Sequence, residues 1–104
     1  MPDDLARRMQ AQGLHPNRWS NDPAERYAAH DHPYDKVLAV ERGSIRFDLP
    51  ATAEAIELAT GDRLDLPATT LHGAVVGPDG VACLEAHLPA GSLGKVRRRP
   101  SGLW

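Results

Sequence analysis

Turn-forming residues divide this chain into short segments, and this division constrains its fold more than any other feature. The 104 residues include nine Gly and nine Pro, and few of the apolar runs between them are long enough to form a core helix. After Asn17 the segments alternate between apolar and polar residues or are rich in β-branched ones, as strands are. The pattern predicts an all-β domain.

We expect about eight strands from their alternation and their bounding turns. The clearest are Lys36–Glu41, Ser44–Leu49, Ala55–Leu58, Arg63–Leu66, His72–Val76 and Val81–Leu88, and weaker ones lie near Asn17–Ser20 and Arg26–His32. The turns at residues 41–43, 60–62 and 77–80 each contain Gly, and we interpret them as connections between antiparallel neighbours. Short, evenly spaced strands favour a sandwich or barrel, because closure removes exposed sheet edges.

The length fits one domain with three parts. We assign residues 1–16 to an N-terminal helix and lead-in, 17–90 to a β-barrel and 91–104 to a basic C-terminal tail. The helix is predicted to begin near Asp3 or Asp4 and to run to about Gln12, and its apolar face, with Leu5 and Met9, should lean on the barrel. We interpret the basic residues of the tail as a solvated terminus and expect no binding of nucleic acid. They are Lys95, Arg97, Arg98 and Arg99.

Composition excludes several classes of protein. Apolar residues make up 41% of the chain and charged residues 25%, which is typical of a globular domain and unlike a disordered chain. The apolar stretches are far shorter than the roughly 18 residues that span a bilayer. The first residues are acidic, unlike a secretory signal, so we expect a cytoplasmic protein. Cys83 is the only cysteine, has no internal partner for a disulfide and is expected to pack in the core.

Three histidines are spaced so that their side chains can converge. His30 and His32 are two residues apart, so in an extended strand both leave the same face. The same parity places Tyr34 and Lys36 on that face, and the apolar residues that follow identify it as the interior. His72 opens a separate strand, and a third imidazole can therefore approach the first two across a barrel.

The spacing of these residues resembles the two sequence motifs of the cupin family. The residues that match are His30, His32 and Gly43 in the first motif and Gly61, Pro67 and His72 in the second. The resemblance covers roughly residues 26–88 and implies a jelly-roll barrel, the double-stranded β-helix of cupins. It also implies that the three histidines are metal ligands and that the chain pairs as a homodimer, as small cupins commonly do.

Two positions depart from the family pattern. Thr69 stands where the second motif usually has Gly, and Lys36 stands where the first motif has its ligand Glu. Because a divalent cation repels an ammonium, Lys36 must be neutral, turned away or paired with an anion if a metal is bound. Some cupins, including thiol dioxygenases and a diketone-cleaving dioxygenase, use three His without the Glu. Zn, Fe(II), Ni or Cu therefore suits such a site. Asp35 should point to the opposite face of its strand and not replace the Glu.

The last long strand presents two different faces. Glu85 and His87 share one face with Cys83, and the other face is apolar. We expect the apolar face to line the barrel and the polar residues to lie on the surface, because a buried charge needs a partner. In the alternative, Glu85 pairs with Lys36 and His87 joins the site. Arg63 and Asp65 are expected on the outer face of their strand.

Three functional hypotheses are consistent with these observations. The first hypothesis is a metal-dependent, dioxygenase-like oxidoreductase that acts on a small acidic metabolite, with Lys36 and Tyr34 as candidate catalytic residues. The second is a non-catalytic module that binds a small ligand or a metal as a sensor, and the third is an isomerase or lyase of sugar-like substrates. In the alternative without metal, the histidines are the remnant of a former metal site. We expect a small-molecule partner and no membrane.

Overall fold

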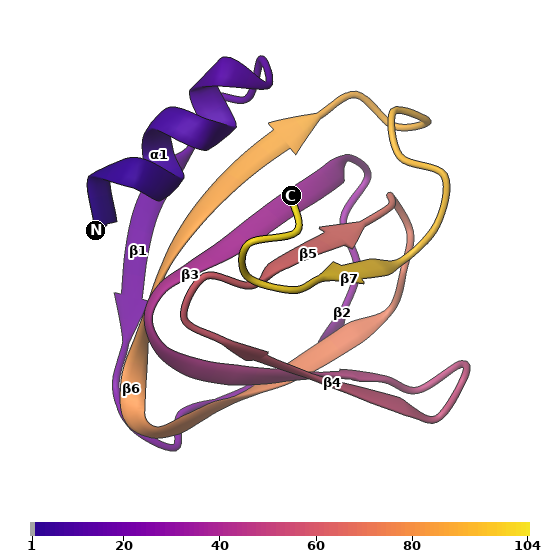
Figure 1. The fold of residues 1–104 in the computed structure, drawn as a ribbon. Coiled ribbons are helices and arrows are strands. Elements are labelled where there is room, and N and C mark those ends of the chain that lie inside the picture. The colour runs from indigo at the N-terminus through magenta and orange to yellow at the C-terminus, as the bar shows by residue number, and fades with distance from the viewer. Residues whose placement is uncertain (1) are drawn as a thin grey trace.

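Two long, bent strands form the frame of the structure. In the computed structural model, which describes residues 2–104, β3 (Asp35–Leu49) pairs antiparallel with β6 (His72–Leu88) along nearly its whole length. β1 (Asn17–Asn21) and β2 (Arg26–His30) pair with the two halves of β6. β4 (Glu54–Ala59) and β5 (Arg63–Leu66) pair with the two halves of β3, and β7 (Arg97–Arg99) adds to β5. The sheet curves over itself into a barrel (Figure 1).

Two of the predicted hairpin turns are bends within continuous strands. β3 runs through residues 41–43 and β6 runs through residues 77–80, so the predicted strand pairs on either side of these turns are each one strand. The register between β3 and β6 shifts on both sides of the bend, as β-bulges do. Gly43 and Gly80 both have φ of +80°, and a Cβ on Gly43 would collide with the carbonyl of Gly80. Glycine at these positions allows a bend within a strand, and not the chain reversal that was predicted.

The third predicted turn connects strands that do not pair with each other. Gly61 lies between β4 and β5 with φ of +92°. β4 pairs with Ser44–Leu49, while β5 pairs with Lys36–Ala39, so the connection crosses the bend of β3. The turn therefore moves the chain from one half of the barrel to the other.

The N-terminal helix covers the outside of the barrel. α1 (Pro2–Ala11) begins slightly earlier than predicted, after Met1, which lies outside the described residues. Leu5 and Met9 are buried as expected, and full burial of such a side chain contributes about 1.5–3 kcal/mol. They pack on the outer face of the central strands, against Val37, Ala39, Leu84 and Ala86. No described helix is long and apolar enough to cross a membrane.

The C-terminal segment is more ordered than a purely solvated terminus, although Lys95, Arg97 and Arg98 are exposed. β7 pairs antiparallel with β5 and forms an edge strand of the sheet, as Figure 1 shows. Arg98 pairs with Asp62 at 2.9 Å, and the indole of Trp104 donates a hydrogen bond to the carbonyl of Gly61. Asp62 and Asp65, at the edge of β5, are the ion-pair partners of Arg98 and Arg99. They are distant in sequence from the basic segment, so the sequence of that segment alone does not predict these pairs.

Arg63 and Asp65 lie on the outer face of β5 as predicted, but they are buried there. Their exposed fractions are 5% and 2%, and Arg63 Nε donates to Asp65 at 2.7 Å. Trp104 covers Arg63, with the guanidinium 5.4 Å from the ring centre. An outer-face position is therefore not a solvent position in this fold.

Candidate metal centre

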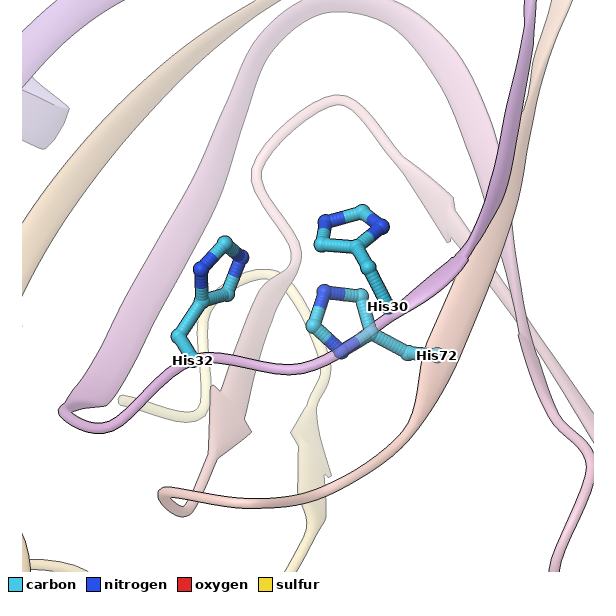
Figure 2. Close-up of side chains that lie close together, drawn as sticks. All are labelled: His30, His32 and His72. Atoms are coloured by element: carbon cyan, nitrogen blue, oxygen red, sulfur yellow. The ribbon is translucent and has the colours of Figure 1, made fainter.

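Three imidazoles meet at one wall of the barrel. His30 ends β2, His32 lies in the loop that follows, and His72 opens β6 directly opposite His30. Their candidate ligand nitrogens all lie within 4.8 Å of one another, and Figure 2 shows the rings gathered in one region. His32 lies beyond the end of the strand on which it was predicted, but its ring still meets that of His30, with 4.8 Å between ring centres.

Backbone carbonyls fix which nitrogen of two imidazoles is free. Nδ1 of His30 lies 2.8 Å from the carbonyl of Ala28, and Nδ1 of His72 lies 2.8 Å from the carbonyl of Thr70. A carbonyl only accepts, so each Nδ1 carries the proton and donates it. The lone pair of each ring is therefore on Nε2, and such hydrogen bonds are the usual support of metal-binding histidines.

The third imidazole contacts a lysine in place of a carbonyl. Lys36 Nζ lies 3.3 Å from Nε2 of His32, and the hydroxyl of Tyr34 lies 3.2 Å from Nδ1. An ammonium only donates, so Nε2 accepts from Lys36, while Nδ1 donates to the Tyr34 oxygen. The phenolic proton of Tyr34 is then available to another acceptor. His32 has the same tautomer as the other two rings, but Lys36 occupies its lone pair.

Glu85 faces the barrel interior, which corrects the preferred prediction for its strand. Its Oε1 lies 3.5 Å from Lys36 Nζ and accepts from the Trp19 indole at 3.1 Å, and its Oε2 lies 2.7 Å from His87 Nε2. The apolar face of β6, with Leu84 and Ala86, instead lies under α1. The alternative in which Glu85 faces the barrel interior and pairs with Lys36 is therefore correct. The sequence did contain a signal for this orientation. The apolar side of the predicted N-terminal helix needs an apolar surface outside the barrel, and the apolar face of β6 supplies it.

His87 lies at the rim of the site. Its side chain is 49% exposed, and its ring stacks on Tyr34 with 4.0 Å between ring centres. No described contact joins it to the three histidines. It supports Glu85 and Tyr34 and is not one of the converging imidazoles.

Burial and nearby charges shift the pKa values of His32, His72 and Glu85. Burial lowers the pKa of His32, and the charge of Lys36 lowers it further. Burial also lowers the pKa of His72, outweighing the opposite effect of its bond to Thr70. Burial alone would raise the pKa of Glu85, but the contacts from His87, Lys36 and Trp19 outweigh it and the net pKa is lowered. These shifts favour neutral imidazoles at His32 and His72 beside an ionised carboxylate at Glu85.

Two other titratable residues of this region have structural roles. Asp35 is fully buried and its carboxylate accepts from the backbone N–H groups of Ala68 and Leu93 at 2.7 and 2.6 Å. These bonds, with that of Ala68 the largest contribution, lower the pKa of Asp35. It thus faces away from the histidines, as expected. Burial raises the pKa of Cys83 to about 12, so it packs as a thiol.

The three histidines line a cavity of about 370 Å³. This volume suits a small organic ligand. Lys36 and Glu85 are the charged residues of its wall among the described residues, apart from the histidines. The rest is largely apolar or aromatic and comprises Trp19, Tyr27, Tyr34, Leu38, Ile45, Phe47 and Ala74, with Ser20 and Asn21. The aromatic residues Trp19, Tyr27 and Tyr34 therefore line the cavity as well as pack.

Comparison with known proteins identifies the fold. No protein family model matches the chain, and no curated protein matches its sequence. Bacillus subtilis oxalate decarboxylase, whose Mn(II) centres have been characterised, matches with a TM-score of 0.60 and 18% identity over 74% of this chain. The chain spans only 21% of that enzyme.

Shorter proteins share the architecture as well. A Rhizobium leguminosarum protein of unknown function matches with a TM-score of 0.66 and 13% identity over 73% of this chain and 70% of its own. YhaK from Escherichia coli matches with a TM-score of 0.69 and 11% identity over 88% of this chain and 44% of its own. At such identities the likeness concerns the fold.

The fold is that of a cupin barrel, and its three converging histidines are a candidate metal site. The described chain forms one cupin barrel of antiparallel strands with a short N-terminal helix, which confirms the fold implied by the sequence motifs. Within it, Lys36 occupies the motif position of the usual ligand Glu and contacts a histidine. The candidate site therefore has a cation beside its three imidazoles.

Proposed function

We propose that this protein is a metal-dependent, dioxygenase-like enzyme that acts on a small acidic metabolite. The observation that carries the proposal is the convergence of three imidazoles on a cavity whose wall presents the ammonium of Lys36. His30, His32 and His72 would hold the metal through Nε2. Three neutral nitrogen ligands leave positions open for further ligands.

The donor set fits a metal with modest adjustment. Metal–nitrogen bonds of about 2.1 Å bring ligand atoms to roughly 3.0–3.4 Å from one another, whereas the three nitrogens lie within 4.8 Å here. The most widely separated pair of nitrogens needs to close by about 1.4–1.8 Å, and the exposed His30 and partly exposed His32 have the freedom to do so. A divalent metal there supplies Lewis acidity and, as Fe(II), electron transfer with O2.

Lys36 and Tyr34 would bind and orient the substrate. Lys36 offers its ammonium to a carboxylate, and Tyr34 offers the phenolic proton that its contact with His32 leaves free. The apolar part of the cavity excludes water from the rest of the ligand. The similarity to oxalate decarboxylase supports a small carboxylic acid as substrate and adds Mn to the metals to be tested.

A second candidate is a non-catalytic barrel that binds a small acid. It is favoured by the contact of Lys36 with His32 and Glu85, because the polar groups of the site satisfy one another without a metal. Both candidates use the same cavity and bind the acid through Lys36. They differ in that the second catalyses no reaction.

Anaerobic reconstitution with Fe(II) tests the proposal. We expect equimolar iron after removal of free metal, and oxygen uptake when a panel of small carboxylic acids is added. His72→Ala should abolish both, and His15→Ala, at an exposed histidine outside the cavity, should change neither. Iron binding without oxygen uptake, with thermal stabilisation by an acid, would establish the second candidate. Failure to bind any of Fe, Mn, Zn, Ni or Cu would overturn the metal site.

A further inference from the structure

We infer that a metal and a small carboxylate bind to this cavity cooperatively, each strengthening the other, because the carboxylate draws Lys36 away from His32. The inference rests on the proposed function, in which the three histidines bind metal. It adds that the site is a synergistic one: the organic anion completes the metal centre that the chain leaves incomplete.

The first step is the competition for one lone pair. Lys36 Nζ lies 3.3 Å from Nε2 of His32, while Tyr34 faces the opposite nitrogen of the same ring. A lone pair that accepts from an ammonium cannot at the same time bind a metal. His30 and His72 have no such competitor among the described contacts, since each donates from Nδ1 to a carbonyl. Metal binding by all three rings therefore requires Lys36 to move.

The second step is that Lys36 has little alternative support within the protein. Its side chain is only 10% exposed, so it cannot simply extend into water. Glu85 is the anion next to it, at 3.5 Å, but the carboxylate of Glu85 also accepts from Trp19 and contacts His87. Glu85 is thus held in place by partners on both oxygens and does not follow Lys36 freely.

The third step concerns the charge of the cavity. Lys36 and Glu85 balance each other when the imidazoles are neutral, and a divalent metal adds two positive charges to a partly buried wall. A bound carboxylate removes one of these charges, pairs with the displaced ammonium and offers its oxygens next to the histidines. The cavity of about 370 Å³ has room for it beside the imidazoles.

The test is a titration of metal-free protein with Co(II) in a bicarbonate-free sulfonate buffer, with acetate or with chloride at equal ionic strength. We expect acetate to raise the affinity for Co(II) at least about tenfold over chloride, and Co(II) to raise the affinity for acetate by the same factor, as linkage requires. Calorimetry and the visible spectrum of Co(II) give independent readouts.

Lys36→Met identifies the residue responsible. This variant should bind Co(II) more tightly than the wild type in chloride, and acetate should then change its affinity less than about twofold. Lys95→Met, at the exposed second lysine outside the cavity, should behave as the wild type. The wild-type comparison is decisive even if Lys36→Met folds poorly.

The possible outcomes distinguish the cooperative site from the metal centre itself. Equal affinity for Co(II) in acetate and chloride overturns the cooperative site and leaves the proposed metal centre intact. Undiminished acetate dependence in Lys36→Met also overturns it. Absence of Co(II) binding in every buffer overturns the proposed metal centre together with the inference.

Discussion

Glu85 Oε1 lies 3.5 Å from Lys36 Nζ, across the pairing of β6 with β3 inside the barrel. This ion pair joins the residue that departs most from the cupin motif to a carboxylate on the neighbouring strand. The side chains of Lys36 and Glu85 are 10% and 17% exposed, so solvent screens the attraction between the two charges only weakly.

Glu85→Gln is expected to weaken both the fold and metal binding. It leaves the Lys36 ammonium without its carboxylate and alters the contacts of Trp19 and His87, at a cost of about 1–3 kcal/mol. Metal affinity should fall because the cavity becomes more positive. Urea denaturation and calorimetric metal titration measure these effects, and Glu54→Gln, at an exposed glutamate of β4, is the matched control. Equal effects of the two variants would contradict the pairing.

Lys36→Glu is expected to tighten divalent metal binding. It replaces a repelling charge with a carboxylate at the motif position of the usual ligand, and we expect a gain of at least about tenfold in affinity. The metal-free variant should be less stable than the wild type, because Glu85 then faces a like charge. An unchanged affinity in calorimetry would show that side chain 36 does not reach the metal.

His72→Ala is expected to lower metal affinity by about 100-fold or more, because it removes one of three ligands. The residue is 3% exposed, so the effect on stability must be measured in parallel. His15→Ala, at an exposed histidine, provides the comparison for a general loss of imidazole. Metal affinity that is equal in both variants would exclude His72 as a ligand.

The metal-free protein is expected to lose stability as the pH falls below 6.5, the usual pKa of histidine. Burial lowers the pKa of His32 and His72 in the folded state, so the unfolded chain binds protons first and acid favours unfolding. The lowered pKa values of Glu85 and Asp35 act in the same direction, but only at more acidic pH. Thermal unfolding of wild type and His72→Gln from about pH 8 to about pH 5 measures this. The Tm of the variant should fall less steeply with decreasing pH than that of the wild type. Equal slopes would show that His72 does not cause the loss of stability in acid.

Trp104→Ala is expected to destabilise the fold by about 1–2 kcal/mol. The indole donates to the Gly61 carbonyl at 2.9 Å, and Arg8 and Arg63 lie over its ring at 5.0 and 5.4 Å. Leu103→Ala is the control, since Leu103 is 75% exposed. Urea midpoints that coincide for the two variants would show that the C-terminal segment does not stabilise the barrel.

Local spacing made much of the candidate site predictable. The parity of His30, Tyr34 and Lys36 depends on a few consecutive residues, and the structure brings them to one cavity as expected. The period of Leu5 and Met9 likewise predicted a helix that packs on the barrel. The metal, the catalytic roles and the homodimer stay predictions.

The sequence predicted that the turn glycines have positive φ, but it did not predict whether the chain reverses or only bends at each of them. A Gly with positive φ serves a hairpin and a bulge equally well, and only the pairing of β3 with β6 decides between them at Gly43. The tail shows the same limitation: its basic residues suggest a solvated end until Asp62 and Asp65 are seen at the edge of β5.

The sequence by itself determined an all-β chain with a covering helix and three converging histidines, because periodicity and spacing act within a few residues. Only the tertiary structure decided that Glu85 faces inward to meet Lys36. Both faces of its strand are covered, one by the cavity wall and the other by α1, so alternation alone could not assign them. Because α1 packs on the face of β6 that carries Leu84 and Ala86, Glu85 on the opposite face points into the cavity and pairs with Lys36.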